Sequence, residues 1–468
     1  MNKQEHINYF DTIAPKRDEW KKRNWYYHKA LVDLMRFIIP EESTVLDIGS
    51  GTGDLLASVK PKRGVGVDIS PHMIEIAGRK YPTLEWRRDD AEALSLNEKF
   101  DYVMLSDTIG HVEDIERVFH NLPNVTHSET RIIITHINYF WEPMMWLAEV
   151  LHLKARQPLQ NWISPHDVES MLHLAGFEIV KQGRRMIMPV WIPLLSVFCN
   201  RVLAHLPLLS RLGIIQYVVA RPAPKDRKEY SVSIIIPARN EKGNIERALV
   251  EMPAFGLSQE IIFVEGGSID GTLLEIKRVA DAYAEKYTVR YAEQNGTGKG
   301  DAVRKGFSMA TGEMLMILDA DLTVRPKDLP KFYEALATGR GEFINGSRLV
   351  YPLEKESMRF LNILGNKFFS IMFSWLLGQR IKDTLCGTKV LLKKDYERIA
   401  ANRSYFGDFD PFGDFDLIFG SAKLNLKMVE IPIRYQARTY GSTNIQRWKH
   451  GLILLRMVVF AMRKIKFL

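Results

Sequence analysis

Two short motifs in this chain bring together residues suited to different kinds of chemistry. Near the start, Val45-Leu46-Asp47-Ile48 runs into Gly49-Ser50-Gly51-Thr52-Gly53, an apolar strand followed by a glycine-rich turn. Glycines let the backbone approach a ligand closely, so this turn suits a cofactor that carries a ribose. Past the middle, Ile317-Leu318 runs into Asp319-Ala320-Asp321, and two carboxylates at the end of an apolar strand suit a divalent metal ion on a diphosphate. The sequence therefore predicts two chemical sites in one polypeptide.

The elements around the glycine turn predict an α/β fold. Apolar strands alternate with helical stretches from Thr44 to about Arg221, a pattern typical of a parallel, doubly wound sheet. The strand Gly64 to Val67 ends in Asp68, and a carboxylate at that place can accept both hydroxyls of a ribose. Further along, Asp89-Asp90-Ala91-Glu92 follows the third strand, Phe100 to Leu105 forms the fourth, and Ser164-Pro165 predicts the start of a helix that Gly176 ends.

In their order and spacing, these motifs resemble the class I S-adenosylmethionine-dependent methyltransferases, over roughly Tyr26 to Arg221. The turn has the form Gly-x-Gly-x-Gly, whereas a dinucleotide-binding turn has the form Gly-x-Gly-x-x-Gly, so methyl transfer is favoured. The resemblance implies an S-adenosylmethionine site in which Asp47, Gly49 and Gly51 surround the methionine part, Gly53 completes the turn, Asp68 binds the ribose, and Asp90 and Ala91 lie near the adenine.

The acceptor of the methyl group is less well defined by the sequence. His111 follows the fourth strand and His136 ends the strand Ile132 to Thr135, so either can face the cofactor's methyl group as a general base. A lone histidine is more often structural. A further alternative is that the domain binds S-adenosylmethionine without turnover, as a docking or sensing module.

A second series of strand-end motifs begins at Ser231. The strand Val232 to Ile236 runs into Pro237-Ala238-Arg239-Asn240-Glu241, and the strand Ile261 to Val264 runs into Glu265-Gly266-Gly267-Ser268. Gly298-Lys299-Gly300 then precedes the strand that ends in Asp319 and Asp321. Open α/β sheets bind ligands at the carboxyl ends of their strands, so these motifs predict contacts to a nucleotide, a cation on its phosphates and room for a sugar.

This series resembles the family-2 glycosyltransferases of the GT-A fold, through nearly all of residues 231–468. The resemblance implies an inverting transfer from a nucleotide-diphospho-sugar, in which the cation offsets charge on the leaving diphosphate. Asp321 should bind Mg²⁺ or Mn²⁺, and Asp319 should hold the nucleotide or share the ion. The donor would be bound by Pro237, Ala238, Arg239, Glu241, Glu265, Lys299 and Asp319.

Within that family, Asn345-Gly346-Ser347-Arg348 and Lys382 to Gly387 resemble the polyprenyl-phosphate sugar transferases. This likeness implies that Arg348 and Arg359 meet the phosphate of a polyprenyl phosphate or lipid-linked glycan. A phosphate is already anionic at neutral pH, so its attack needs no general base. If the acceptor is instead a soluble or polysaccharide hydroxyl, Asp414 or Asp416 is the natural base.

Charge and hydropathy favour a membrane surface over nucleic acid as a partner of this chain, whose net charge is +8. Near the C-terminus, apolar residues alternate with Arg447, Lys449, Arg456, Arg463, Lys464 and Lys466, a pattern of helices that lie in a membrane interface. Phe368 to Leu377 and Met186 to Asn200 are apolar but too short to span a bilayer. The alternative is that all three segments are core helices.

Two distant cysteines and a polar N-terminus predict a cytoplasmic protein, peripheral on the inner face of the cytoplasmic membrane. A length of 468 residues allows two domains of ordinary size. The polar segment Pro222 to Glu229 contains two prolines and interrupts the strand pattern. We therefore expect a methyltransferase domain at 1–221, a linker at 222–230 and a glycosyltransferase domain at 231–468.

Overall fold

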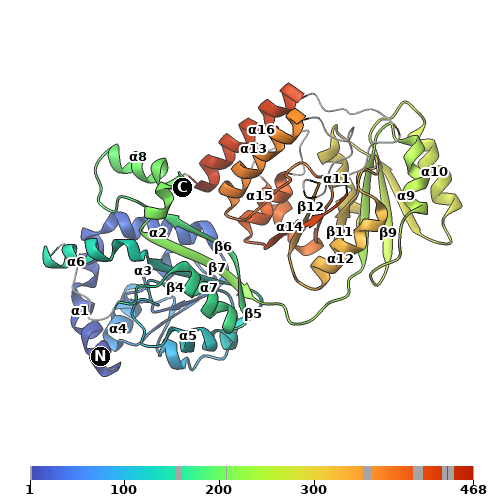
Figure 1. Ribbon diagram of the computed structural model, residues 1–468. Helices are drawn as coiled ribbons and strands as arrows, with labels where there is room; N and C mark the ends of the chain where they lie inside the picture. The colour runs from blue at the N-terminus through green and yellow to red at the C-terminus, as the bar shows by residue number, and fades with distance from the viewer. Residues whose placement is uncertain are drawn as a thin grey trace. The chain divides into compact units, whose positions relative to one another are not determined.

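The computed structural model describes residues 3–152, 160–206, 208–348, 350, 360–403, 415–434, 440 and 447–466. The chain divides into two compact units, Met1–Ala223 with Lys466–Leu468, and Pro224–Ile465 (Figure 1). Each unit contains one seven-stranded sheet with helices packed on its faces. The predicted class of two α/β domains is therefore confirmed. The division lies inside the expected linker, whereas the exact domain boundaries stay a prediction.

The first sheet has the strand order β3-β2-β1-β4-β5-β7-β6. Its strands are β1 (Thr44–Ile48), β2 (Arg63–Asp68), β3 (Glu85–Arg88), β4 (Phe100–Ser106), β5 (Thr126–Ile137), β6 (Phe177–Arg185) and β7 (Ile215–Pro222). The expectation of a wholly parallel sheet is wrong for β7, which pairs antiparallel with both β5 and β6. The connection from β6, which includes α8, enters β7 at the edge where β6 ends, and a strand that starts there must run in the opposite direction.

Helices cover both faces of the first sheet. On β1, Val45 faces the core that α2 (Trp25–Ile38) and α3 (Asp54–Ser58) share. Leu46 and Ile48 face the opposite core, with α5 (Ile115–Asn121) and α7 (Pro165–Leu174). Ser164 and Asp167 form a capping box at the start of α7, as the sequence predicts. The remaining helices of this unit are α1 (Lys3–Arg23), α4 (Pro71–Lys80), α6 (Glu142–Val150) and α8 (Leu195–Arg201), with short 3₁₀ turns at Ala91–Ala93, Leu122–Val125, Tyr139–Trp141, Leu203–His205 and Leu209–Leu212.

The second sheet has the order β10-β9-β8-β11-β13-β12-β14. Its strands are β8 (Val232–Ala238), β9 (Gln259–Glu265), β10 (Thr288–Glu293), β11 (Met314–Ile317), β12 (Phe343–Ser347), β13 (Lys389–Leu392) and β14 (Met428–Pro432). β13 runs antiparallel to β11 and β12, while β8, β9, β10 and β11 pair in parallel. The carboxyl ends of β8, β9 and β11 therefore meet at one edge.

One face of the second sheet is covered by α9 (Lys242–Val250), α10 (Thr272–Ala282) and α12 (Leu329–Ala337). On the other face α11 (Lys299–Met309) packs closely, because a Cβ at Gly306 would lie 2.5 Å from the Ile235 side chain. The remaining helical elements of this unit are α13 (Phe360–Leu377), α14 (Lys393–Ala401), α15 (Phe415–Lys423), α16 (Arg447–Ala461), a 3₁₀ turn (Pro326–Asp328) and a final π-helical turn (Met462–Lys466).

The three apolar segments differ in how much they bury. In α13, Phe373 is buried against Phe415 and Phe419, while Phe368 and Ile371 are exposed. In α16, Met457 and Val458 are buried, and Leu455 and Val459 are exposed. The core-helix alternative thus holds for one face of each of these helices. The third segment, Met186 to Asn200, leaves most of its large side chains exposed. No helix among the described residues is both long and apolar enough to cross a membrane.

The residues that follow Ala223 make side-chain contacts with the second unit. These contacts indicate that the chain can be cut between Ala223 and Pro224 without disturbing either unit. The guanidinium of Arg227 pairs with Glu334 at 2.7 Å, and the Tyr333 hydroxyl donates to Glu229 at 2.5 Å. We predict that a protease site inserted between Ala223 and Pro224 yields two halves that both stay folded after cleavage, because each has its own sheet and core. Circular dichroism melting before and after cleavage checks this. Loss of the helical signal in either half would place the boundary elsewhere.

Candidate active sites

The glycine turn after β1 is built around two close contacts and one open position. A Cβ at Gly49 would lie 2.5 Å from Oγ1 of Thr108, and Gly49 has a φ of +78°. A Cβ at Gly53 would collide with the ring of Trp86. Nothing lies within 4 Å of a Cβ built at Gly51, whose N–H donates to Oδ2 of Asp68 at 2.8 Å. The backbone at Gly51 is therefore accessible to a ligand.

Two carboxylates, the buried Asp47 and the half-buried Asp68, lie beside this turn. Asp68 ends β2 and also accepts the N–H of Ser70 at 2.9 Å. Burial, and next the charge of Asp68, raise the pKa of Asp47 to about 7. Burial also raises the pKa of Asp68, despite the hydrogen bonds from Ser70 and Gly51. Such a pair favours a ligand that brings positive charge, because a cation stabilises the ionised forms.

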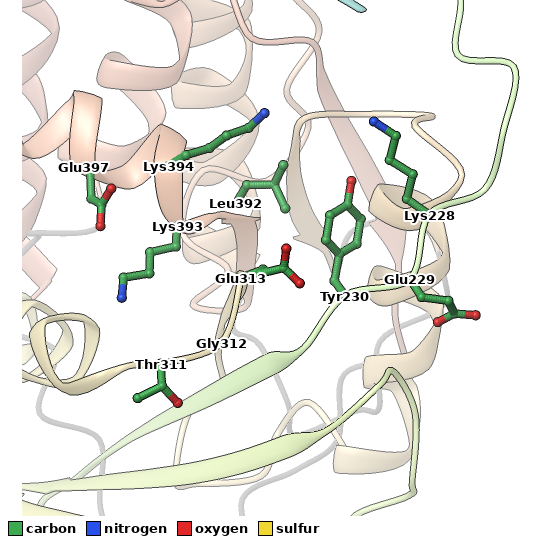
Figure 2. Close-up of a pocket in the computed structure, with 10 residues that line it drawn as sticks. All are labelled: Lys228, Glu229, Tyr230, Thr311, Gly312, Glu313, Leu392, Lys393, Lys394 and Glu397. Carbon is green, nitrogen blue, oxygen red and sulfur yellow. The ribbon is translucent and has the colours of Figure 1, made fainter.

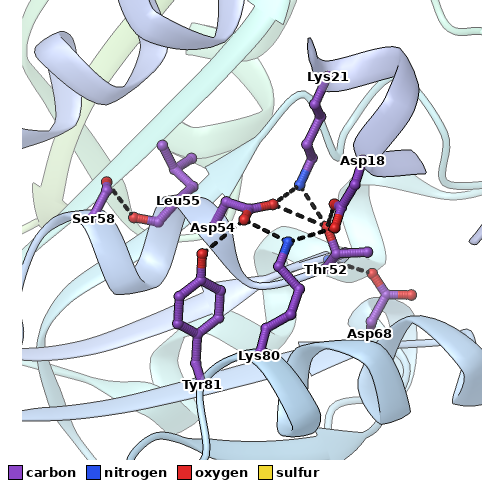
Figure 3. Close-up of polar contacts among 10 residues, drawn as sticks. Asp18, Lys21, Thr52, Asp54, Leu55, Ser58, Asp68, Lys80 and Tyr81 are labelled. Carbon is purple, nitrogen blue, oxygen red and sulfur yellow. Dashed lines mark hydrogen bonds and ion pairs between the residues drawn. The ribbon is translucent and has the colours of Figure 1, made fainter. Parts of the chain in front are cut away.

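Helix α1 binds the loop that follows β1, the start of α3 and the end of α4 (Figure 3). The ammonium of Lys21 donates to Thr52 at 2.7 Å and to Asp54 at 2.5 Å. Asp18 accepts from Thr52 at 2.9 Å and from Lys80 at 2.8 Å. Burial acts to raise the pKa of Asp54, but Lys21, Lys80 and Tyr81 hold it well below its usual value. No local sequence pattern indicated these contacts, because they join residues far apart in the chain.

The same helix reaches the residues expected near the adenine and the methyl group. Lys3 forms an ion pair with Asp90, whose carboxylate also accepts the N–H of Glu92 at 3.0 Å, in the 3₁₀ turn that contains Ala91. The ring of Phe10 lies edge-on to His111, with the centroids 5.9 Å apart. His111 therefore lies against α1 near the cofactor edge of the sheet.

His136 lies inside β5 and is 4% exposed. Burial lowers the pKa of His136 to about 4, although a hydrogen bond with Gln216 acts to raise it. The imidazole is therefore neutral at physiological pH. Its role as a general base stays a prediction.

Asp107 is a residue at this edge that the sequence reasoning missed. It directly follows β4 with a φ of +57°, in the left-handed region. Its carboxylate accepts from the Tyr27 hydroxyl at 2.7 Å and from Thr135 Oγ1 at 3.2 Å. The next residue, Thr108, is the one that packs against Gly49. The available signal was an acidic residue just after an apolar strand, as at Asp68.

In the second unit, Lys299 and Asp319 come together at the carboxyl edge of the sheet. The ammonium of Lys299, the first residue of α11, lies 2.6 Å from Oδ1 of Asp319. Both groups reach Gly387, where any side chain would collide with them. Two residues beyond Asp319, Asp321 accepts the N–H of Thr323 at 3.1 Å and its hydroxyl at 2.8 Å. The structure therefore brings together three residues that the sequence singles out.

The loops after β8 and β9 also meet at this edge. Burial acts to raise the pKa of Glu265, but hydrogen bonds from Ser268 and from neighbouring backbone N–H groups lower it. Glu241 is buried and accepts from Asn244 at 2.7 Å, and its N–H donates to Thr272 at 3.0 Å. Each carboxylate thus orders its own loop, and the backbone N–H of Glu241 joins the two loops, contacts that the local sequence did not indicate.

The other residues expected to bind a nucleotide occupy the same loops. Ala238 is buried and Pro237 is half-buried, while Arg239 is exposed. The hydroxyl of Tyr440 donates to Asp270 at 3.3 Å, and its ring packs on Gly243. An exposed cation and an aromatic side chain therefore border the loops that follow β8 and β9.

Of the four residues predicted to contact an acceptor, the structure describes two, Arg348 and Asp416. Arg348 follows β12, and its Nε and Nη2 bind the two oxygens of Asp383 at 2.7 and 2.8 Å. Burial acts to raise the pKa of Asp383, but the charge of Arg348 lowers it to about 2. Asp416 lies 3.3 Å from Arg403 in an ion pair. Arg359 and Asp414 lie outside the described residues.

A cavity also opens at the opposite edge of the second sheet (Figure 2). Its walls come from the start of β8, the turn before β11 and the start of α14, so it lies away from Asp319 and Asp321. The lining residues are Lys228, Glu229, Tyr230, Thr311, Gly312, Glu313, Leu392, Lys393, Lys394 and Glu397. None of them belongs to the strand-end motifs.

Two family models match the chain, one in each unit. Residues 20–182 match the model described as a methyltransferase domain, and residues 233–399 match glycosyl transferase family 2. These matches define a chain that joins two kinds of transferase domain. The chain belongs to glycosyltransferase family 2, and its N-terminal unit matches a methyltransferase domain.

Two curated relatives match the second unit. A dolichol-phosphate mannosyltransferase of Pyrococcus furiosus is 30% identical over 220 residues, which cover 46% of this chain and 59% of that protein. A dolichyl-phosphate beta-glucosyltransferase of Drosophila melanogaster is 30% identical over 242 residues, which cover 46% of this chain and 70% of that protein. The chain thus spans little more than half of the first relative.

Solved structures resemble each unit separately. A possible histamine N-methyltransferase from Thermotoga maritima is 17% identical with a TM-score of 0.37, covering 46% of this chain and 99% of that one. Glucosyl-3-phosphoglycerate synthase from Mycobacterium tuberculosis, in complex with Mn²⁺ and uridine diphosphate, is 18% identical with a TM-score of 0.37, covering 51% of this chain and 80% of that one.

The Arg348–Asp383 pair generates a prediction about stability. Arg348→Ala leaves a fully buried carboxylate without its partner, which should cost about 3 to 5 kcal/mol of unfolding free energy at neutral pH. The pKa of Asp383 is lower in the folded protein than its ordinary value of 3.8, so the ionised carboxylate stabilises the fold at pH values above 3.8. This contribution is lost as the pH falls toward about 2. The deficit of the variant should therefore narrow on acidification below about 4.

Thermal melting at neutral and acidic pH measures that deficit. Arg278→Ala, which removes an exposed arginine paired with Glu246 and Glu275, is the control and should melt close to the wild type at both pH values. A deficit that is equally large in acid would show that the loss does not come from the charge of Asp383.

Proposed function

We propose that the second unit transfers a sugar, with inversion, from a nucleotide-diphospho-sugar to a polyprenyl phosphate or lipid-linked glycan. The first unit transfers a methyl group from S-adenosylmethionine. The observation that carries the proposal is the convergence of Lys299, Asp319 and Asp321 on the edge formed by β8, β9 and β11. The names of the two dolichol-phosphate relatives support a lipid phosphate as the acceptor.

In the donor site, Asp319 and Asp321 would bind Mg²⁺ or Mn²⁺, and such an ion commonly takes one or two carboxylates and substrate phosphates. The bound cation supplies charge that stabilises the leaving diphosphate. Lys299 adds a second positive group beside the same phosphates. The nucleotide would be bound at the ends of β8 and β9 and in the loop after β8, by Pro237, Ala238, Arg239, Glu241 and Glu265.

On the acceptor side, an anionic phosphate oxygen attacks the sugar carbon as the bond to the diphosphate breaks. Asp383 fixes the guanidinium of Arg348 at the end of β12, from where Arg348, with Arg359, would bind the acceptor phosphate. Asp416 is paired with Arg403, and a nearby cation makes a carboxylate a weaker base. This pairing favours a phosphate acceptor over a hydroxyl that needs deprotonation by Asp416, while Asp414 stays the other candidate base for a hydroxyl acceptor.

In the first unit, Asp47, Gly49, Gly51 and Gly53 would surround the methionine part of S-adenosylmethionine. Asp68 would bind the ribose, and Asp90 and Ala91 would lie near the adenine. The sulfonium and amino groups of this cofactor bring the positive charge that Asp47 and Asp68 favour. This match supports cofactor binding.

The proposed location is the inner face of the cytoplasmic membrane. The exposed apolar side chains of α13 and α16 support this placement, because they lie on helices that bury their opposite faces. Nucleotide sugars screened with polyprenyl phosphate and Mn²⁺, with the product identified by mass, test the sugar transfer. Absence of any lipid product, with transfer to a soluble glycan instead, would overturn the lipid acceptor.

The raised pKa of Asp47 predicts a pH dependence of cofactor affinity. A cationic ligand prefers the ionised carboxylate, and in the ligand-free protein Asp47 takes up a proton below about pH 7. S-adenosylmethionine should therefore bind about tenfold more weakly for each pH unit below 7 and with constant affinity above it. Calorimetric titration measures this slope. Asp47→Asn, which keeps the shape of the side chain, should bind more weakly and lose the slope; an unchanged slope would assign it to another group.

For the donor site, Asp321→Asn should lower both donor hydrolysis and sugar transfer by roughly 100-fold or more, because it removes an anionic ligand of the cation. Added Mn²⁺ should recover little of either activity. Asp395→Asn is the matched control, since Asp395 pairs with Arg398 on α14, which begins at the other edge of the sheet. Titration of nucleotide diphosphate with Mn²⁺ provides a direct binding measurement. Wild-type binding by the Asp321 variant would exclude this residue from the metal site.

A further inference from the structure

More than half of the large hydrophobic side chains that are exposed in the described part of the chain lie in two segments of the first unit, 139–151 and 190–212. We call them together the apolar face. Helix α6 in the first segment has no buried residue, and Trp146 on it is 65% exposed. Helix α8 in the second segment buries only Ser196. Apolar surface of this extent on a folded domain marks an interaction site.

The second segment is packed with its polar side chains inside and its apolar side chains outside. Ser196 Oγ accepts the N–H of Ile192 and donates to the carbonyl of Val190, both at 2.7 Å. Asn200 accepts the N–H of Met188 at 2.9 Å and donates to its carbonyl at 2.8 Å. In contrast, Leu194 is 86% exposed and Phe198 is 53% exposed. The ordered backbone therefore presents these apolar groups outward.

Specific contacts join the two segments into one face. The indole N–H of Trp141 donates to the carbonyl of Leu212 at 2.7 Å. The amide of Asn138, just before the first segment, donates to the carbonyl of Gly213 at 2.9 Å. Trp191 packs on Tyr26, with the ring centroids 5.0 Å apart, and on the exposed Trp25 at 5.7 Å. The apolar face is thus continuous with the start of α2.

The apolar face lies at the cofactor edge of the first sheet. Its segments follow the carboxyl ends of β5 and β6, and β5 is parallel to β4 and, through it, to β1. Tyr27, the neighbour of Tyr26, binds Asp107 beside the glycine turn. Figure 1 shows α6 and α8 as outlying helices of this unit, beyond the sheet. A molecule bound on this face therefore borders the place of methyl transfer.

The charges around the apolar face fit an anionic lipid surface. Residues 179–225 contain no Asp or Glu, but they include Arg184, Arg185, Arg201 and Arg211. Only Glu142 and Glu149 are acidic in the first segment. Tryptophan and tyrosine favour the boundary between lipid headgroups and acyl chains, and arginines next to them bind anionic headgroups.

We propose that the methyltransferase unit docks on an anionic lipid bilayer through the apolar face, and that its methyl acceptor is a membrane-bound molecule. The docking is independent of the sugar acceptor, whereas the acceptor class rests on the proposed methyl transfer. The protruding loop around Leu194 would enter the interface. Its strained backbone, with a φ of +65° at Leu194, holds the side chain away from the protein.

Flotation of the full chain with vesicles of phosphatidylcholine and phosphatidylglycerol tests the docking. Leu194→Asp with Phe198→Asp should lower the partition coefficient by about tenfold or more, because two charges would enter the interface. Leu174→Asp is the matched control, since Leu174 is 68% exposed on α7, outside the apolar face, and should change partition less than about twofold. Binding of S-adenosylmethionine verifies that each variant is folded.

Several outcomes would overturn the proposal. Equal partition of the double variant and the wild type would show that the apolar face does not contact the bilayer. A wild-type dimer that the double variant converts into monomers, without vesicle binding by either, would assign the face to a second copy of the chain. Methyl transfer to a water-soluble extract but not to a lipid extract would overturn the acceptor class.

Sugar transfer to a short polyprenyl phosphate in detergent should be unchanged in the double variant. Failure of the docking is therefore distinguishable from failure of the proposed function.

Discussion

Parallel pairing of neighbouring strands is the constraint on which both candidate sites depend. Because β1, β2 and β4 run in one direction, the glycine turn, Asp68 and Asp107 leave the sheet at the same edge. The same holds for β8, β9 and β11, which deliver the loops of Glu241 and Glu265 and the carboxylates of Asp319 and Asp321. The one antiparallel strand near the donor site, β13, begins at this edge, so it places Gly387 against Asp319.

The acidic side chains at the two sites differ in whether the protein itself supplies a positively charged partner. In the second unit Asp383 is compensated within the protein by the two-pronged contact of Arg348, so its carboxyl stays ionised. In the first unit Asp47 and Asp68 lie close together and burial raises the pKa of both. A compensated pair rigidifies the fold, whereas an acidic pair is most stable when a cationic molecule arrives. This contrast separates a positioning contact from a ligand site.

Local sequence predicted the strands, the residues at their ends and the cap at Ser164, because each depends on neighbours in the chain. It also predicted which strand-end residues share an edge, since strand direction follows from the alternation with helices. It missed the direction of β7 and the contacts of α1, which depend on how distant segments pack. Arg348 shows the same limit: its position after a strand was visible, but its partner Asp383 is 35 residues away. Glu241 and Glu265 were singled out correctly as edge residues, but their structural hydrogen bonds were not foreseen.

The contacts of α1 have a consequence for how quickly the first unit exchanges a bound molecule. Side chains of this helix hold the loop after β1 through Thr52, the loop after β2 through Ser70 and the turn after β3 through Asp90. A cofactor in contact with those three loops would lie beside these bonds, and its residence time would then depend on the first turns of the chain as well as on the loops. Shortening or tagging the N-terminus would therefore alter the rate of turnover through product release while leaving the sheet intact.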